Sequence, residues 1–487
     1  MAAGGTWQSQ NKVRPGAYIN FVGTPKALSS VGERGVVAAP LSLSWGAQII
    51  EMTANDLVTG ASQEKAGVLF TDAEALNLRL LLQSCARAVI YRLNAGTAVK
   101  AAKTVAGLTV TAKHGGAFGN RIRFTVQAPE AEEPESGGGE GGSGEGGGGE
   151  QTPGFTPSNG GDGTRAMRSG DGEATEPIIV KTYVDGSLKD TQKVATLADL
   201  VANDYAEFEA AEGTLVSIET PTALEGGSDG EEVTDISAAL AALESYKFNI
   251  LAISQTASAT KAQAVQWIES LRNDKGVKVQ CVVCEYAGDS EAVISTWQGY
   301  RLEDGTEVSM AQAVLAVAGM EAGAAITQSL SGAVVPGAVA VIDPPQTHDE
   351  IVDALNAGKL VLSRRGDGSI VIEKDQNTLH TFTPKHGYVF SKNRPIRVID
   401  QIGNDVRDLW NNTYLGKVSN DENGRSIFKN ELVSYFKTLE KIGAIQNFRA
   451  DDLIVLPGND TDAVVVTMYV QPVDSMEKLY TTVNVEG

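Results

Sequence analysis

The hydrophobic pattern in the middle of the chain predicts a strand–helix–strand unit. Residues 248–254 form a short apolar run of the kind found in buried strands. Residues 257–273 follow with apolar residues at helical spacing, and Gly276 favours a stop after this helix. Residues 277–286 form a second apolar run. Two strands joined by such a helix lie side by side and parallel, so this order predicts a parallel sheet covered by helices.

Similar patterns predict further elements on both sides of this unit. Helical spacing of apolar residues predicts helices over residues 72–88, 310–328, 348–357, 395–410 and 430–442. Alternating or β-branched apolar residues predict strands over residues 108–111, 122–127, 178–184, 463–470 and 478–485. Residues 359–363 and 369–373 are expected to form a hairpin around a Gly-Asp-Gly turn. The pattern indicates a mixed α/β and α+β protein with more than one domain.

A Gly-rich, acidic stretch interrupts the pattern between residues 130 and 176. It contains 11 acidic residues against Arg165 and Arg168, which is −9 of the net charge of −21. It has almost no large apolar side chains to offset the entropy of ordering its backbone, so we expect an exposed, disordered loop inserted between strands of one small β domain. A calcium site within it is disfavoured, because its acids lack the regular spacing of a calcium-binding loop.

Composition excludes several classes of protein. The 487 residues suffice for roughly three domains. An excess of 61 acids over 40 bases argues against a nucleic-acid binder, which needs clustered cations. Three cysteines cannot form a disulfide framework. The polar N-terminus does not look like a signal peptide, and the apolar stretch at residues 310–342 is too interrupted for a membrane span. We therefore expect a soluble protein made inside the cell, with no direct membrane insertion.

Signatures of catalysis are scarce. The sequence has no phosphate-binding Gly-Lys-Ser/Thr loop, no His-Glu-x-x-His motif and no Gly-x-Ser-x-Gly elbow. Cys281 and Cys284 fall within a predicted strand, which favours buried structural thiols over a redox pair. We expect no enzyme activity, no cofactor and no metal. The alternative is an α/β enzyme with an unrecognised active site, which predicts a pocket with perturbed acids at the carboxyl ends of the parallel strands. Arg365-Gly366-Asp367 matches an adhesion tripeptide, but it is also ordinary hairpin-turn chemistry, which is favoured. A surface adhesin is a third alternative, weakened by the missing export signal.

Six segments together resemble one protein family. The chain resembles contractile tail sheath proteins of bacteriophages and phage-tail-like bacteriocins, most nearly those of Gram-positive hosts. Residues 375–384 (DQNTLHTFTP) and 391–405 (SKNRPIRVIDQIGND) are similar to Asn-Thr-Leu and Asn-Arg-x-Ile-Arg-Val-x-Asp segments of the family. The other four matches, in family order, are residues 14–20, 113–122, 316–330 and 474–483.

The resemblance implies a structural subunit that forms stacked hexameric rings around a tail tube and contracts to drive the tube through a bacterial envelope. It implies a homo-oligomer in a helical array, with the tail tube, baseplate and tail-terminator proteins as further partners. It also implies a place in a virion or phage-tail-like particle, assembled in the host bacterial cytoplasm.

Terminal arms are a further implication of the resemblance, since arms of family members add strands to the sheet of another subunit. The β-prone runs at the two ends are the candidates, and the alternative is that they pair within their own domain. The predicted exchange residues are Val13, Pro15, Tyr18, Ile19, Leu479, Tyr480, Val483 and Val485.

The resemblance also implies that a helix of the C-terminal domain faces the tube, and residues 430–442 are the best match. Lys437 and Lys441 lie four apart on it, with Arg425 and Lys429 nearby, which makes a basic patch on an acidic protein. The alternative is an ordinary solvated helix face.

With the resemblance, the expected fold is a parallel-sheet α/β core with an inserted β-sandwich-like domain and N- and C-terminal β arms. The expected segments are an N-terminal arm (1–22), a small α/β domain (23–97), the β-sandwich-like domain (98–194) with its disordered loop (130–176), a main α/β domain (195–358), a C-terminal α+β domain (359–474) and a C-terminal arm strand (475–487).

Overall fold

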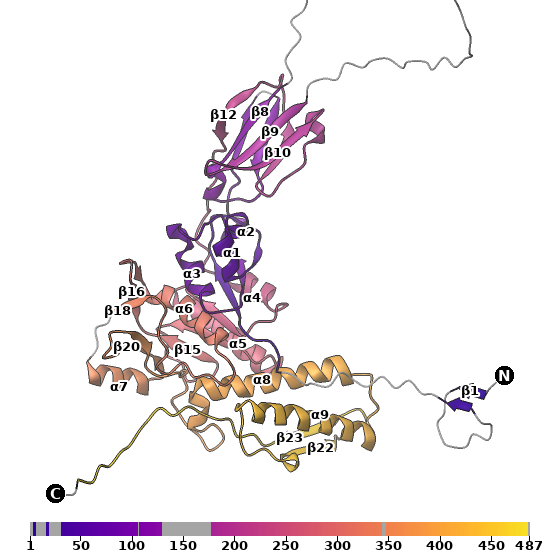
Figure 1. Cartoon of the computed structure of the whole chain (residues 1–487), viewed down its shortest axis with the longest axis vertical. Helices are drawn as coiled ribbons and strands as arrows, with labels where there is room; N and C mark the ends of the chain where they lie inside the picture. Colours follow the sequence, from indigo (N-terminus) through magenta and orange to yellow (C-terminus); the bar gives the residue numbers. More distant parts are fainter. Residues whose placement is uncertain are drawn as a thin grey trace, which may run out of the picture. The chain divides into compact units, whose positions relative to one another are not determined.

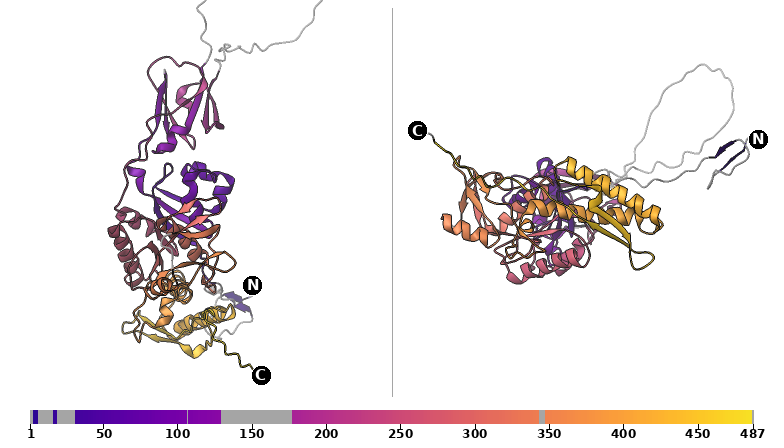
Figure 2. Two further views of the ribbon diagram at one scale, coloured as in Figure 1. Left: turned by 90° about the vertical axis from the view of Figure 1, so that its left-hand side faces the viewer. Right: turned by 90° about the horizontal axis from the view of Figure 1, so that it is seen from below.

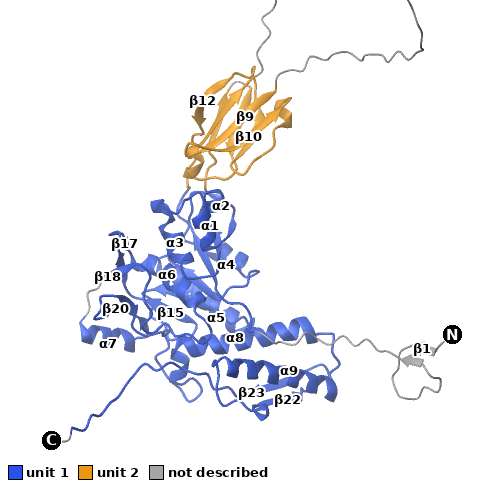
Figure 3. Ribbon diagram, in the orientation of Figure 1, with its two compact units in different colours: residues 1–97, 230–487 blue, residues 98–229 orange. Residues whose placement is uncertain are grey.

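The computed structural model describes residues 31–105, 107–128, 177–342 and 347–485, together with the backbone of two short strands, β1 (Ala3–Gly5) and β2 (Gly16–Tyr18) (Figure 1). The chain forms two compact units (Figure 3). The first consists of residues 1–97 and 230–487, and the second of residues 98–229.

A mostly parallel seven-stranded sheet is the centre of the first unit, in the order β19-β15-β14-β13-β3-β5-β4. Only β4 is antiparallel to its neighbour. Nearly every residue of the central strands is buried, as expected for a sheet covered on both faces. The strands are β3 (Val36–Leu41), β4 (Ile49–Met52), β5 (Arg87–Arg92), β13 (Ile250–Ile253), β14 (Gln280–Cys284), β15 (Val293–Thr296) and β19 (Lys359–Leu360).

The predicted strand–helix–strand unit is confirmed. β13 and β14 pair in parallel, and α5 (Ser258–Asn273) connects them. β13 also pairs in parallel with β3, so segments from before and after the second unit share one sheet. This pairing helps explain why residues 31–97 and 230–485 belong to one compact unit. The sequence analysis divides them among a small α/β domain (23–97), a main α/β domain (195–358), a C-terminal α+β domain (359–474) and an arm strand (475–487). The six-segment division remains a prediction.

Helices cover both faces of this sheet. Alternate residues of β3 belong to different cores: Val37 packs with α3 and α6, and Ala38 packs with α4 and α5. Gly319 and Gly323 of α6 lie so close to the backbone around α3 that an added Cβ would come within 2.5 and 1.8 Å of carbonyl oxygens there. The helices of this part are α1 (Ala54–Thr59), α2 (Ala61–Ala66), α3 (Leu76–Leu82), α4 (Ser237–Leu243), α6 (Met310–Gly323) and α7 (His348–Asn356), with 3-10 turns η1 (Ala73–Ala75) and η2 (Leu93–Gly96).

Three element predictions in this unit needed correction. The helix expected over residues 72–88 is only η1 and α3, because Arg87 already begins β5 and pairs with β3. The helix expected over residues 310–328 ends at Gly323. Of the expected hairpin, β20 (Leu362–Arg364) and β21 (Ile370–Ile372) pair, but Lys359 and Leu360 join the large sheet instead. A small antiparallel sheet is formed by β16 (Gly299–Leu302), β17 (Glu307–Val308) and β18 (Ala338–Ile342).

Two long helices and a hairpin form the C-terminal part of the first unit. A single hydrophobic core joins α8 (Asn393–Leu409), α9 (Glu422–Lys441), β22 (Leu453–Pro457) and β23 (Val464–Met468) (Figures 1 and 2). The side chain of Asp421 accepts a hydrogen bond from the Gly424 amide, which explains why α9 begins before the predicted start at residue 430. The shorter turns are η5 (Tyr388–Ser391), η6 (Trp410–Tyr414) and η7 (Ala450–Asp452).

The second unit contains two antiparallel sheets, β10-β9-β8-β12 and β11-β7-β6. Its predicted strands are confirmed as β7, β8 and β9, and their side chains alternate between buried and partly exposed. The strands are β6 (Ala102–Val105), β7 (Leu108–Ala112), β8 (Ile122–Gln127), β9 (Ile178–Val184), β10 (Ser187–Val194), β11 (Ala206–Ala210) and β12 (Ile218–Ala223), with turns η3 (Ala117–Arg121) and η4 (Leu197–Asp199).

The acidic segment connects two neighbouring strands of this unit. β8 and β9 pair antiparallel, so the segment is an insertion within one sheet, as predicted; residues 129–176 themselves lie outside the described residues. The unit extends to Asp229, beyond the predicted boundary at residue 194, because β11 pairs with β7 and β12 pairs with β8.

Candidate assembly interfaces

The C-terminal segment runs away from the rest of its unit (Figures 1 and 2). The strand predicted over residues 478–485 is absent from the single chain, since no partner strand among the described residues pairs with it. Its large apolar side chains are uncovered: Leu479 is 90% exposed, Tyr480 88%, Val483 76% and Val485 87%. A run of uncovered apolar side chains of this kind is typical of interaction surfaces.

Three of the four predicted N-terminal exchange residues, Val13, Pro15 and Ile19, lie outside the described residues. Of Tyr18 only the backbone is described, at the end of β2, which pairs in parallel with β1. The role of this arm therefore remains a prediction.

The predicted tube-facing residues divide into two groups on α9. Lys437 and Lys441 are exposed and lie one turn apart on the same face, and within the described part of the chain neither forms an ion pair. Lys429 is half-buried. Arg425 is turned toward its own chain: its Nη1 donates to the backbone oxygen of Asn420 at 3.1 Å and to the Asn420 Oδ1 at 2.9 Å. The two lysines thus share a free face, and Arg425 is held apart from it.

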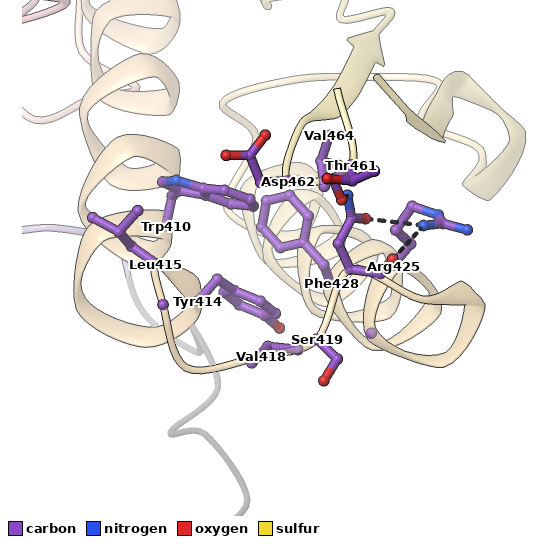
Figure 4. A pocket seen from close by; sticks show the side chains of 13 residues that line it. Trp410, Tyr414, Leu415, Val418, Ser419, Arg425, Phe428, Thr461, Asp462 and Val464 are labelled. Carbon is purple, nitrogen blue, oxygen red and sulfur yellow. Dashed lines mark hydrogen bonds between the residues drawn. The ribbon is translucent and has the colours of Figure 1, made fainter. Parts of the chain in front are cut away.

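Arg425 lines a cavity of about 470 Å³ that sequence reasoning missed (Figure 4). Three aromatic rings form its base, with centroids 5.4 Å apart for Trp410 and Phe428 and 4.6 Å apart for Tyr414 and Phe428. Trp410 and Tyr414 follow α8 and are four residues apart, and Phe428 comes from α9. The loop before β23 closes another side with Asp462. The spacing of Trp410 and Tyr414 was the available signal, but it is equally typical of a packed helix face.

Tyr414 is fixed in this cavity by a hydrogen bond. Its hydroxyl donates to Glu431 Oε2 at 2.5 Å. Burial raises the pKa of Tyr414, and the neighbouring Glu431 carboxylate raises it further. The phenol is therefore neutral and serves to orient the ring.

A second feature missed from the sequence is a buried charge cluster around Arg397 of α8. The Arg397 guanidinium forms ion pairs with Glu321 of α6 and, at 2.7 Å, with Asp375 Oδ2, and all three side chains are at most 1% exposed. Its Nη2 also donates to the Gln328 backbone oxygen at 2.6 Å. Asn393 donates to Glu321 Oε1 at 3.0 Å. Residues from three of the six resembling segments, 316–330, 375–384 and 391–405, thus meet at one arginine.

The two carboxyl groups of this cluster have opposite pKa shifts. Burial raises the pKa of Glu321 well above its ordinary value, and the neighbouring Asp375 adds to this effect. Burial also acts to raise the pKa of Asp375, but Arg397 and a hydrogen bond from the Leu330 amide outweigh it and lower the pKa. One proton shared by a buried carboxyl pair beside one cation leaves the cluster close to neutral.

The cluster is separate from the aromatic cavity, since Glu321, Asp375 and Arg397 do not line it. Cys281 and Cys284 are buried, and burial raises the pKa of both thiols. Among the described residues, no group of three or more His, Cys, Asp or Glu side chains is arranged to hold a metal ion. Among the helices that the structure describes, none combines the length and the hydrophobicity of a membrane span.

Comparison with known proteins identifies the family. Residues 229–378 match the phage tail sheath protein central domain, and residues 387–486 match the phage tail sheath C-terminal domain. The phage-like element PBSX protein XkdK of Bacillus subtilis (strain 168) is 32% identical, over 99% of this chain and 99% of its own.

Solved structures agree with this match. The sheath tail protein of Desulfitobacterium hafniense has a TM-score of 0.74 and 36% identity, covering 96% of this chain and 99% of its own. The sheath tail protein of Listeria innocua has a TM-score of 0.75 and 28% identity, covering 93% and 95%. The fold alone is shared with the contracted helical sheath of the anti-feeding prophage, at 11% identity and a TM-score of 0.53 over 97% and 99% of the two chains.

These matches span the whole chain and point to a structural role, so the enzyme alternative is not supported. The resemblance seen in the sequence, including its Gram-positive character, is confirmed. The chain belongs to the phage tail sheath protein family and is a contractile tail sheath structural protein.

Proposed function

We propose that this chain polymerises as stacked hexameric rings in a helical array around a tail tube, and contracts to drive the tube through a bacterial envelope. It would do so in a virion or phage-tail-like particle assembled in the host bacterial cytoplasm, with baseplate and tail-terminator proteins at the two ends of the array. The observation that carries this proposal is the uncovered apolar C-terminal arm, in a chain whose full length is similar to tail sheath proteins.

The C-terminal arm is proposed to add a strand to another subunit. In an extended conformation Leu479, Val483 and Val485 project to one side, so main-chain hydrogen bonds would supply affinity and this row would supply specificity. The proposed N-terminal arm, with Val13, Pro15, Tyr18 and Ile19, would act in the same way.

The hairpin β22–β23 is the proposed acceptor. It is a two-stranded sheet, and neither outer edge has a partner strand among the described residues. One face packs on α9, whereas Ile454, Leu456 and Val465 on the other face are 39%, 54% and 50% exposed. Unpaired edges beside exposed apolar side chains favour the addition of strands from other chains.

Contraction is proposed to use free energy stored during assembly. Subunits would move largely as rigid bodies on extended arms, and their interfaces would switch between discrete packings. The proposed hinge of the N-terminal arm, near residues 23–28, lies outside the described residues.

The exposed pair Lys437 and Lys441 is the proposed contact with the tube, with Lys429 at its margin. Arg425 is a weaker candidate, because its guanidinium already bonds to Asn420. Exposed ion pairs contribute only about 0–1 kcal/mol each, but repetition along a tail multiplies them. Contacts of this strength suit a sheath that first holds the tube and later slides past it.

Negative-stain electron microscopy of the full-length chain tests the proposal, with the protein prepared alone and together with its tube protein. Long hollow tubes with helical striation are expected in both preparations, and sheathed tubes in the second. Discrete small particles under both conditions would contradict the proposal.

A further inference from the structure

The chain between β23 and the exposed arm is attached to the core by backbone hydrogen bonds. The amide of Gln446 donates to the Gln471 oxygen at 3.0 Å, and the amide of Val473 donates to the Ala444 oxygen at 3.0 Å. Beyond Val473 no backbone bond among the described residues ties the chain to the core. Side chains must provide whatever attachment exists after this point.

Two carboxylates supply that attachment through one buried lysine. Lys392, with its side chain only 3% exposed, forms ion pairs with Glu477 and, at 3.3 Å, with Asp474 Oδ2. The Glu477 side chain is 16% exposed, and its other oxygen accepts a 2.6 Å hydrogen bond from the Ser331 hydroxyl. The next residues, from Lys478 to Val485, are all exposed.

The position of Lys392 makes these carboxylates necessary. A buried ammonium is unfavourable unless anions lie close to it. The backbone of Lys392 is also the N-cap of α8, and the amino end of a helix favours anions nearby. Burial acts to lower the pKa of Lys392, but Glu477 and Asp474 outweigh it and raise the pKa. Burial likewise acts to raise the pKa of Glu477, and Lys392 and Ser331 reverse the sign. Among the described residues, Lys392 forms ion pairs with Asp474 and Glu477 alone, so the folded core holds this segment through that one positive charge.

Ser331 connects the attachment to the buried cluster. Its hydroxyl oxygen accepts a hydrogen bond from the Asp375 amide at 2.8 Å while it donates to Glu477. Asp375 is in turn the partner of Arg397. The point where the chain leaves the core is thus linked through Ser331 and Asp375 to the buried cluster.

We propose that Lys392, Glu477, Asp474 and Ser331 form a clamp that fixes the C-terminal arm to its own subunit, so that the free arm begins at Lys478. The role of the clamp in assembly rests on the proposed arm exchange, whereas the contacts that form the clamp do not. Eight extended residues, 478–485, span at most about 29 Å. The clamp therefore requires the acceptor strand on a neighbouring subunit to lie within that distance of Glu477, and it transmits tension on the arm directly to α8.

Spin labelling of the unassembled full-length chain tests the clamp. The cysteines at positions 85, 281 and 284 are buried, so a nitroxide can be placed selectively through Met476→Cys or Val483→Cys. In the parent protein the label at position 476 should move severalfold more slowly than the label at position 483. Lys392→Met should bring the label at 476 to the mobility of the label at 483, and leave the latter unchanged.

Two further variants keep the test decisive. The double variant Asp474→Asn and Glu477→Gln removes the anions without altering the core lysine, and serves if Lys392→Met does not fold. Lys247→Met is the matched control, because it breaks an exposed ion pair with Asp408 in the same unit and should change neither label.

The clamp is overturned if the label at 476 is as mobile as that at 483 in the parent, or if neither clamp variant releases it. Because the readout uses unassembled protein, it is separate from tube formation. If the clamp variants release the label but the parent protein forms no tubes, the result would support the clamp and contradict only the proposed arm exchange.

Discussion

The Arg397 guanidinium of α8 donates a hydrogen bond to the Glu321 side chain of α6, and neither side chain is more than 1% exposed. The pair joins two helices that contact different parts of the first unit, since α6 packs on the large sheet and α8 packs with α9. A buried ion pair gives little net stability compared with an apolar contact, but loss of one partner strands a charge. The cluster therefore connects the C-terminal helices to the helix that packs on the sheet.

Replacement of the buried cation should be strongly destabilising. Arg397→Met leaves Glu321 and Asp375 without their shared cation, and we expect a loss of about 3–5 kcal/mol in the free energy of unfolding. Urea unfolding of the monomer, followed by circular dichroism, measures this loss. Lys247→Met is the control, since Lys247 is 80% exposed, and it should change the free energy by at most about 1 kcal/mol. Equal effects of the two substitutions would contradict the role of the cluster.

Stability should depend on pH through Glu321. Because burial raises its pKa in the folded chain, the folded state binds a proton that the unfolded chain releases, and stability falls as pH rises from 4.5 through the raised value. Glu321→Gln cannot ionise, so it should unfold at a higher urea concentration than the parent at pH 8, with the difference vanishing near pH 4.5.

The matched control for this experiment is Glu244→Gln, which alters an exposed partner of Lys275. Its unfolding midpoint should follow that of the parent at each pH. A Glu321→Gln variant that was less stable than the parent at pH 8 would show that Glu321 is ionised in the folded protein.

Two C-terminal truncations should distinguish the role of the exposed arm from that of the residues that attach it to the core. Residues 478–485 are all exposed, so deletion of residues 478–487 should leave the unfolding midpoint unchanged while tubes disappear in electron micrographs. Deletion of residues 475–487 also removes Glu477 and should cost about a further 1–3 kcal/mol, because Lys392 then keeps only Asp474. Deletion of residues 1–20 should also yield folded monomers that do not polymerise. Long tubes from any of these deletions would refute the corresponding arm.

Charge reversal on α9 should block attachment to the tube and spare self-assembly. Lys437→Glu with Lys441→Glu should form tube-free polysheath but should not load on tubes, because the exposed face would then repel an acidic partner surface. The control pair is Lys189→Glu with Lys193→Glu on β10, which are likewise exposed and four residues apart. Cosedimentation with purified tubes measures loading, and normal loading of the α9 variant would remove these lysines from the contact.

Local patterns in the sequence predicted most of the large elements. The strand–helix–strand unit around α5 and the helices α7 and α8 follow from apolar spacing, because burial of one face requires a fixed period whatever the rest of the chain does. The same reasoning failed over residues 72–88, where helical spacing continues into β5. Arg87 instead pairs with Val36 in the sheet. No local pattern distinguishes the start of this strand from the end of a helix.

The candidate interfaces were likewise predictable only in part from the sequence. Uncovered apolar residues at the C-terminus and the lysine pair on α9 could be proposed from the sequence, because alternation and four-residue spacing are local properties. The aromatic cavity at Trp410, the cluster at Arg397 and the clamp at Lys392 could not, since their partners are separated by tens of residues.

The sequence by itself determined the family, the positions of the main helices and strands, and the break at the acidic insertion, since each rests on residues close together in the chain. Only the tertiary structure decided which distant segments share a sheet and which charges are buried together. Lys392 is an ordinary basic residue in the sequence, and it becomes an anchor because folding removes its ammonium from water and brings Glu477 to it across 85 positions of chain. Desolvation and long-range pairing are properties of the packed chain, and no local pattern encodes them.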